Sequence, residues 1–522
     1  MLWIKKVLTV LVLVLLCSQG RAAGRASHVI LMVWDGMRPD FVSAATTPAL
    51  MQMEAEGVTF LHHHPVYLSA TEVNGTALAT GVYPGESGVI GNHEFRPAID
   101  PLAPIGTEET AAVRKGDQLT SNHYLAFPTV SEILHDNGLP TAVTGSKPVA
   151  LLHDRAARAP GSLGITLFAG DTLPEEMEKS LAESLGKFPK AGAGKSAQDD
   201  WTTRALTGPL WEKGLPAYSL LWMAEPDFSQ HRFGPGSPEA LAVIKNNDDN
   251  LARLRAVLKA KNLEDSTDII VVSDHGFSTI FTNIDVVATL RAHGLQAYRK
   301  FPGAQRKERD IMVVGNGGSA YCYVTGHDSN LITQIVHYLQ AEPYTGVVFS
   351  QPPVAGAFPL EDSHLNSPAA PDVVAVLRWK PDQNKYGAPG LIYCDGKTLG
   401  PGQGQHASLG PADMHNTCVA FGPDFNKGMK DALPTGNIDI APTILWILGV
   451  KPKEKMSGRV LSEALTGGGP AVTSSRSYHR QTSWKGEGFV WRQYLDSSEV
   501  NGVIYFDEGN GDQTADVTSS VK

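Results

Sequence analysis

Aspartate and histidine residues recur at the ends of short apolar segments of this 522-residue chain. Asp35 follows "HVILMVW", Asp227 and His231 follow "YSLLWMAEP", and Asp274 and His275 follow "DIIVVS". Carboxylates mixed with imidazoles suit a borderline cation such as Zn²⁺, whereas calcium and magnesium sites consist almost entirely of oxygen ligands. We therefore expect these side chains to bind divalent metal.

The last ligand position has two candidates. The segment "GQHASLGPADMH" supplies both His406 and His415. With either histidine, the set is larger than one tetrahedral ion needs. We therefore expect two divalent metal ions, with Zn²⁺ favoured. Paired metals about 3.5–4 Å apart stabilise both the attacking and the leaving oxygen of an in-line displacement at phosphorus.

A threonine is the candidate nucleophile. In "YLSATEVNGTALATG", Thr71 stands where a helix is expected to begin, so its hydroxyl is also a candidate helix cap. Coordination to a dication lowers the pKa of a hydroxyl, and the N–H groups of a helix N-terminus favour a phosphoryl anion. Asn74 is expected to aim its amide at a phosphate oxygen. Lys147, in "TGSKPVA", is a further candidate for a phosphate contact.

These residues require a scaffold that brings strand ends together. Apolar segments with the length of buried strands lie at 28–34, 141–145, 218–224, 268–272 and 417–421, with helical patterns between them. This alternation predicts a doubly wound α/β fold, with a mostly parallel sheet flanked by helices. Ligands bind outside the carboxyl ends of the strands in such sheets, which is where the candidate residues stand.

Two parts of the chain are expected to lie outside this sheet. Residues 285–371, approximately, are predicted to form an inserted smaller lobe. Within it, "RDIMVVGNGGSAYCYV" has two strand-like runs around Asn316 and Gly317, which indicates a hairpin rather than a phosphate-binding loop. The polar tail, 468–522, is predicted to be a C-terminal extension that ends in a hairpin. The catalytic domain would then occupy 23–467.

The N-terminal segment has the layout of a secretory signal peptide. Lys5 and Lys6 precede an apolar run from Val7 to Leu16, and small residues follow near Ala22. We expect cleavage there, which would remove residues 1–22. The run is short for a membrane span, and no later segment is apolar enough to be one. The product is therefore predicted to be secreted or periplasmic, with no membrane span after signal removal.

Charge and cysteine content argue against other classes of protein. The formal net charge of -10 and an isoelectric point of about 5.9 do not suit a nucleic-acid scaffold. From the expected metal ligands and Thr71, we expect the partner to be a small phosphate-ester substrate. Cys322, Cys394 and Cys418 are too few for a disulfide framework or a cysteine-based metal site. We expect them to be buried free thiols, with one disulfide as the alternative.

As an ordered set, "WDGMRPD", "TEVN", "EPDFSQH", "SDHG" and "GQH" resemble the nucleotide pyrophosphatase/phosphodiesterase family of the alkaline phosphatase superfamily, from about residue 27 to about 465. The resemblance implies an alkaline-phosphatase-like fold. It implies that the metal activating the nucleophile is held by Asp35, Thr71, Asp274 and His275, and the second metal, beside the leaving group, by Asp227, His231 and His406. Asn74 would contact the phosphate. Thr71 would attack phosphorus and form a covalent phospho-threonine intermediate, which water then hydrolyses.

Two positions depart from the family's pattern. The family usually has His-Gly at the last ligand, where this chain has His406 and Ala407; we place His415 second because His406 keeps the Gly-x-His context. Certain monoesterases of the superfamily grip extra phosphate charge with a lysine followed two residues later by arginine, but Val149 follows Lys147 here. The incomplete clamp favours cleavage of phosphodiester or pyrophosphate bonds of nucleotides. The alternatives are a phosphomonoesterase, a phosphonate hydrolase and a non-catalytic binding relative.

Overall fold

A nine-stranded sheet forms the centre of the computed structural model, which describes residues 24–156, 161–190, 192, 194–303, 306–468 and 472–516. Its strand order is β21-β2-β20-β9-β1-β8-β5-β6-β7. In chain order the strands are β1 (His28–Trp34), β2 (Val58–His64), β5 (Thr141–Gly145), β6 (Gly164–Phe168), β7 (Asp171–Leu173), β8 (Tyr218–Met223), β9 (Thr267–Val272), β20 (Cys418–Phe421) and β21 (Met429–Gly436). Each of the predicted strands is present, and the sheet is mostly parallel. The predicted fold class is therefore confirmed.

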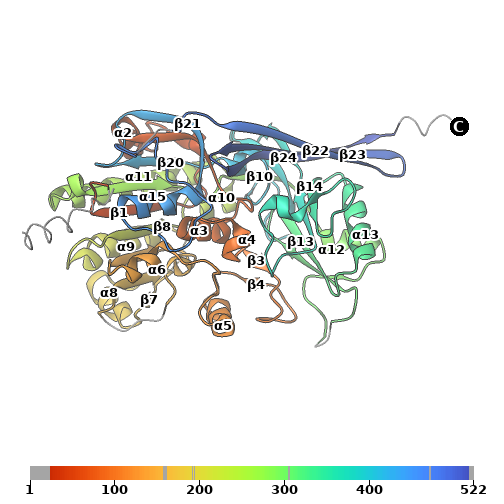
Figure 1. Cartoon of the computed structure of the whole chain (residues 1–522), viewed down its shortest axis with the longest axis horizontal. Coiled ribbons are helices and arrows are strands. Elements are labelled where there is room, and N and C mark those ends of the chain that lie inside the picture. The colour runs from red at the N-terminus through yellow and green to blue at the C-terminus, as the bar shows by residue number, and fades with distance from the viewer. Residues whose placement is uncertain are drawn as a thin grey trace, which may run out of the picture.

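Helices cover both faces of this sheet (Figure 1). Successive side chains of a strand point to opposite faces, so Val29 and Leu31 of β1 pack in one core while Ile30 and Met32 pack in the other. The first core includes helices α3 (Thr71–Thr80), α6 (Val130–Asp136), α7 (Ala150–His153) and α15 (Ile440–Ile447). The second includes α2 (Pro48–Glu56), α9 (Ser196–Thr207) and α11 (Pro238–Ala260).

A second, six-stranded sheet lies beside the first, on the right in Figure 1. Its order is β11 (Ala297–Tyr298), β12 (Ile311–Gly315), β13 (Ser319–Val324), β16 (Val373–Leu377), β14 (Thr345–Ser350) and β15 (Phe358–Pro359). Helices α12 (Val286–Ala292) and α13 (Ser329–Gln340) pack on it. Strands β12 and β13 are antiparallel and joined through Asn316 and Gly317, which confirms the predicted hairpin. The residue bounds given above for the lobe and the catalytic domain stay predictions.

Two smaller sheets complete the surroundings of the candidate site. One has the order β17 (Trp379–Gln383), β18 (Pro389–Asp395), β10 (Ser278–Ile284) and β19 (Gly404–Gln405). The other pairs β3 (His93–Glu94) with β4 (Ile105–Gly106). The C-terminal tail contains the expected hairpin, β23 (Phe489–Val500) and β24 (Val503–Ala515), but a third strand, β22 (Arg476–Lys485), extends it into a sheet. This three-stranded sheet extends across the upper right of Figure 1, above the second sheet.

Several expectations concern single features rather than the architecture. Cys322, Cys394 and Cys418 are buried and free, as predicted. No helix among the described residues is long and apolar enough to cross a membrane. The predicted signal peptide, residues 1–22, lies outside the described residues.

Candidate metal centre

Four neighbouring parallel strands deliver the predicted site residues to one edge of the central sheet. Strands β9, β1, β8 and β5 are adjacent and run in the same direction. Their carboxyl ends therefore lie together, as in other doubly wound sheets. Asp274 and His275 follow β9, Asp35 follows β1, Asp227 follows β8 and Lys147 follows β5. Residues far apart in the sequence are brought to one place by strand order alone.

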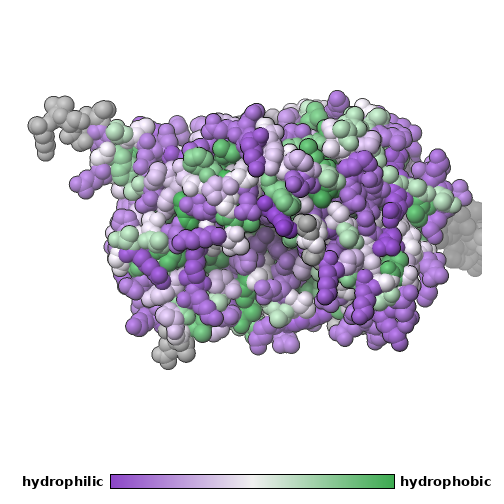
Figure 2. Space-filling model, turned by 180° about the vertical axis from the view of Figure 1, so that it is seen from behind, coloured by the Kyte–Doolittle hydropathy of each residue, from purple (hydrophilic) through white to green (hydrophobic). Residues whose placement is uncertain are grey.

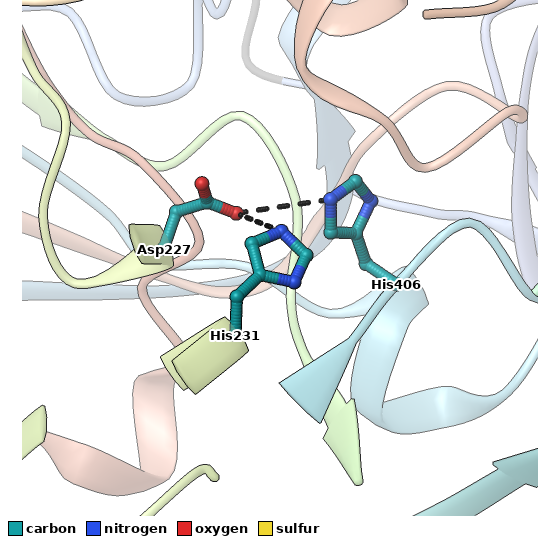
Figure 3. Close-up of side chains that lie close together, drawn as sticks. All are labelled: Asp227, His231 and His406. Carbon is teal, nitrogen blue, oxygen red and sulfur yellow. Dashed lines mark ion pairs between the residues drawn. The ribbon is translucent and has the colours of Figure 1, made fainter. Parts of the chain in front are cut away.

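One cluster consists of Asp227, His231 and His406, whose ligand atoms lie within 4.8 Å of one another (Figure 3). Asp227 and His231 belong to helix α10 (Asp227–Phe233), and their spacing of four residues places them on the same helix face. Oδ1 of Asp227 lies 3.1 Å from Nε2 of His231 and 3.7 Å from Nε2 of His406. His406 follows β19 and reaches the cluster from the opposite side.

A second cluster shares Asp227 and adds Asp35 and His275. Nε2 of His275 lies 3.7 Å from Oδ1 of Asp35, 3.2 Å from Oδ2 of Asp274 and 3.2 Å from Oγ1 of Thr71. The hydroxyl of Thr71 therefore lies within this second cluster. These side chains are all buried.

The three histidines are oriented in the same way. Nδ1 of His231 lies 3.0 Å from the carbonyl of Gly404, Nδ1 of His275 lies 2.8 Å from that of Gly276, and Nδ1 of His406 lies 2.9 Å from that of Ser69. A carbonyl only accepts hydrogen bonds, so each Nδ1 must donate. In its neutral form, each ring then presents the lone pair of Nε2 to the carboxylates. Metal-binding histidines are oriented in this way by hydrogen bonds of their second nitrogen.

One oxygen of each carboxylate also lacks a hydrogen-bond donor in the described structure. Oδ1 of Asp35, Oδ1 of Asp227 and Oδ2 of Asp274 are buried and receive no well-aligned hydrogen bond from the described residues. Burial, together with the charge of Asp274, raises the pKa of Asp35 well above its usual value, and burial raises the pKa of Asp274 to about 7. Because lone pairs and carboxylates face one another, the donor set fits divalent cations of the zinc type.

Lys147 is the positive charge nearest to these carboxylates in the described structure. Its Nζ lies 2.9 Å from Asp35, 3.1 Å from Asp227 and 3.4 Å from Oγ1 of Thr71. Burial alone would lower the pKa of Lys147, but Asp227 and Asp35 raise it well above its usual value. Burial alone would raise the pKa of Asp227, but Lys147 and His231 hold it well below. Lys147 is therefore a fixed cation beside the Thr71 hydroxyl.

Thr71 is the first residue of helix α3, but its hydroxyl does not cap the helix. The N-cap is Ala70, and no side chain caps this N-terminus. The capping role predicted for Thr71 is therefore wrong. Its hydroxyl lies instead between His275 and Lys147, where it can serve as a nucleophile.

The contacts of Asn74 do not fit the prediction that its amide contacts a phosphate. Its Oδ1 accepts from the backbone N–H of Val66 at 2.8 Å and from Nδ2 of Asn437 at 3.0 Å. Its Nδ2 lies 3.0–3.2 Å from the carbonyls of Val66, Leu68 and Ala70. A helical Cα–Cβ bond tilts towards the helix N-terminus, so Asn74 reaches back to the preceding loop. It fixes the loop that precedes Thr71.

Asn92 is a polar residue of the site that the sequence analysis missed. It is half-buried, its Oδ1 accepts from the N–H of Glu72 at 3.2 Å, and it lines a cavity of about 560 Å³ together with His231 and His406. The face shown in Figure 2 is hollowed near its middle and surrounded by mostly hydrophilic residues. Asn92 stands in "VIGNHEF", a loop without periodic pattern, where only the turn residues Gly-Asn gave a signal.

The structure separates the two candidates for the last ligand. His406 joins Asp227 and His231, whereas the ring of His415 packs 4.9 Å from that of His64, outside both clusters. Ala407, which departs from the family's glycine, has a φ of +73°. This left-handed conformation costs a non-glycine residue roughly 1–2 kcal/mol. This cost explains why glycine suits the position. With alanine there, His406 still lies in the cluster with Asp227 and His231.

Comparisons with known proteins identify relatives in sequence and in fold. The sequence pattern of the type I phosphodiesterase / nucleotide pyrophosphatase family matches residues 29–386. Human ectonucleotide pyrophosphatase/phosphodiesterase family member 7 is 23% identical over 57% of this chain, which spans 56% of that relative's length. Mouse bis(5′-adenosyl)-triphosphatase enpp4 is 23% identical over 82% of this chain and 78% of its own. Murine ectonucleotide pyrophosphatase/phosphodiesterase 5, solved as an inactive variant in complex with AMP, has a TM-score of 0.60 at 17% identity and covers 84% of this chain and 100% of that one.

Proposed function

Because the chain belongs to the type I phosphodiesterase / nucleotide pyrophosphatase family, a family of hydrolases, we propose that it cleaves phosphodiester or pyrophosphate bonds of nucleotides or related small phosphate esters. Relatives named for nucleotide pyrophosphatase and bis(5′-adenosyl)-triphosphatase activity support this substrate class. The observation that carries the proposal is the common orientation of His231, His275 and His406, with Nε2 towards buried carboxylates.

Two divalent cations, with Zn²⁺ favoured, complete the proposed site. Asp35, Thr71, Asp274 and His275 would hold the first, and Asp227, His231 and His406 would hold the second. Bound dications lower the pKa of a hydroxyl and neutralise the charge of a phosphoryl group. The carboxylate oxygens without hydrogen-bond donors and the three Nε2 lone pairs support this assignment.

Thr71 acts as the nucleophile in the proposed reaction. Its Oγ1 forms a bond to phosphorus while the bond between phosphorus and the leaving oxygen breaks, which gives a phospho-threonine intermediate and releases the leaving group. Water then attacks phosphorus, the bond between phosphorus and Oγ1 breaks, the phosphate product is released, and a proton from the water restores the threonine hydroxyl. The N–H groups at the start of α3 face developing negative charge. The amide of Asn92, rather than that of Asn74, donates to a phosphoryl oxygen, and the Lys147 ammonium adds positive charge.

A phosphomonoesterase is the second candidate, and Lys147 is the observation that favours it. Its ammonium, 3.4 Å from Oγ1 of Thr71, would suit the extra charge of a monoester. Val149 does not extend this clamp. Its side chain is buried against α3, within 2.6 Å of the position that a Cβ on Gly75 would take. We therefore retain diester or pyrophosphate cleavage as the proposal. A phosphonate hydrolase fits the same donor set.

We also propose that residues 1–22 are a signal peptide and that the enzyme acts outside the cytoplasm, secreted or in the periplasm. The basic residues and the apolar run of the N-terminal segment support this location.

The test compares the nitrophenyl diester of thymidine monophosphate with nitrophenyl phosphate. We expect turnover of the diester, with a higher kcat/KM than for the monoester, and loss of activity in Thr71→Ala and after chelation, with recovery on adding Zn²⁺. Thr80→Ala is the matched control, because its hydroxyl lies on the same helix and donates only to the carbonyl of Thr76. A kcat/KM ratio well below one would assign a monoesterase. Full activity of Thr71→Ala would remove the proposed nucleophile.

A further inference from the structure

The β12–β13 hairpin of the second sheet reaches the cavity beside the candidate metal centre. Gly315, Asn316 and Gly317 at its turn line the same cavity as Asn92 and His406. Asn316 is buried, and its backbone N–H closes the turn by donating to the carbonyl of Ser319 at 2.8 Å. The turn therefore contacts the centre from outside the central sheet.

The side chain of Asn316 holds the backbone of His93 at two points. Its Oδ1 accepts from the N–H of His93 at 2.9 Å, and its Nδ2 donates to the carbonyl of His93 at 3.1 Å. A carboxamide that pairs with both backbone groups of one residue fixes the position and the orientation of that peptide segment. His93 directly follows Asn92, so this pair sets where the Asn92 side chain enters the cavity.

Further contacts hold the same loop against the second sheet. The hydroxyl of Tyr321 on β13 donates to the carbonyl of Ile90 at 2.5 Å. A Cβ on Gly91 would lie 2.8 Å from the carbonyl oxygen of His93, 3.1 Å from the Tyr321 ring and 3.2 Å from Nδ2 of Asn316. The loop and the hairpin therefore touch so closely that the loop residue between them has no room for a side chain.

The other side of the same turn holds the segment that carries His406. The N–H of Gly318 donates to the carbonyl of His406 at 2.9 Å, and Oγ of Ser319 donates to the carbonyl of Ala407 at 2.6 Å. A Cβ on Gly318 would lie 2.9 Å from the Ser408 side chain. One turn thus contacts both Asn92's loop and the segment of a candidate metal ligand.

We infer that Asn316 is a positioning residue for the phosphoryl-transfer site: by pairing with both backbone groups of His93, it holds the Asn92 carboxamide beside the N-terminus of α3. The second sheet then contributes to catalysis, because it fixes one wall of the site from outside the central sheet, which supplies most of the candidate metal ligands. The inference rests on the proposed function for its effect on rate, but the contact itself is independent of it. A displacement of about 1 Å in a positioned group can cost about 100-fold in rate.

The test is a double-mutant cycle of Asn92→Ala and Asn316→Ala, read with the diester substrate. We expect Asn316→Ala to lower kcat about 10- to 100-fold with little change in KM, and the double variant to be within about twofold of Asn92→Ala. Asn316→Asp, which keeps the acceptor but places a carboxylate against the carbonyl of His93, should share the loss. Asn330→Ala, an exposed asparagine on α13, is the matched control and should keep wild-type rates.

Hydrogen–deuterium exchange of the peptide covering residues 88–95 separates the inference from the proposed function. We expect exchange to be at least about tenfold faster in both Asn316 variants than in the wild type. Losses that multiply in the double variant, or unchanged exchange of this peptide, would overturn the inference. If the wild type cleaves no phosphate ester, the proposed function fails, and the exchange result alone decides whether Asn316 holds the loop.

Discussion

Asn74 lies on helix α3 and Asn92 on a loop beside the start of that helix, and the structure predicts opposite consequences for removing their side chains. Asn74→Ala removes the two hydrogen bonds accepted by Oδ1 and the two N–H groups of Nδ2, which are shared among three carbonyls. It leaves the buried N–H of Val66 and one N–H of Asn437 without an acceptor. An unsatisfied buried donor costs about 1–3 kcal/mol, so the expected loss of unfolding free energy is about 2–5 kcal/mol.

Asn92→Ala removes only one recorded hydrogen bond, from the N–H of Glu72, at a half-buried position. Its expected cost in stability is about 1 kcal/mol or less. The same change removes the proposed donor to the phosphoryl group, and loss of one such donor typically lowers kcat by about 100- to 1,000-fold. Asn92→Ala should therefore be folded and nearly inactive, whereas Asn74→Ala should be unstable.

The two variants are compared by urea unfolding and by kcat with the diester substrate below the unfolding transition. Asn74→Ala should show a clearly lower urea midpoint, and its folded fraction should retain more activity than Asn92→Ala. The assignment of the two amides would be refuted if Asn74→Ala kept the wild-type midpoint but lost turnover. Wild-type turnover by Asn92→Ala would refute it equally.

Two further predictions concern buried charge. Burial, together with the charge of Asp424, raises the pKa of Asp268 to about 9. The folded state therefore holds this proton more tightly than the unfolded chain does. As a result, the free energy of unfolding falls as pH rises from about 4 towards 9. Asp268→Asn should therefore raise the thermal midpoint at pH 8 and raise it less at pH 5, and a gain independent of pH would contradict this origin. Lys147→Met removes the cation between Asp35 and Asp227. Because breaking a buried ion pair costs about 3–5 kcal/mol, the variant should have a lower melting temperature than the wild type when a chelator is present. Zn²⁺ should then raise its melting temperature more than that of the wild type, and equal shifts in thermal melts would show that the lysine does not compete with metal.

The central strands could be predicted because they are buried, and buried strands stand out in the sequence as runs of mostly apolar residues. Strands β1, β5, β8 and β9 are covered on both faces, and most of their residues are apolar. Strand β2, "VTFLHHH", lacks this pattern. His63 is buried there because Thr435 and Asn437 pair with its two ring nitrogens at 2.9 and 3.0 Å, and burial lowers its pKa to about 3. Those partners lie more than 370 positions away, so no local pattern predicts them.

The candidate metal ligands could be predicted for a related reason. Strand ends in a parallel sheet converge whatever the loops do, so the types of the residues after β1, β8 and β9 indicated the chemistry. The roles of Asn74 and Asn92 did not follow from spacing. Asn74 lies one helical turn from Thr71 but reaches back to the loop, while Asn92 is placed by a hairpin that begins more than 200 residues later.

The sequence by itself determined which chemical groups are available and which segments become buried strands, because both depend on residue type and short-range period. Only the tertiary structure decided which groups face one another. In the folded chain, the Nε2 atoms of three histidines face carboxylates, and His415 lies outside both clusters. The Thr71 hydroxyl does not cap its helix, and Asn316 contacts His93. Most of these arrangements depend on contacts between residues more than 170 positions apart, whose geometry is set by packing of the whole chain.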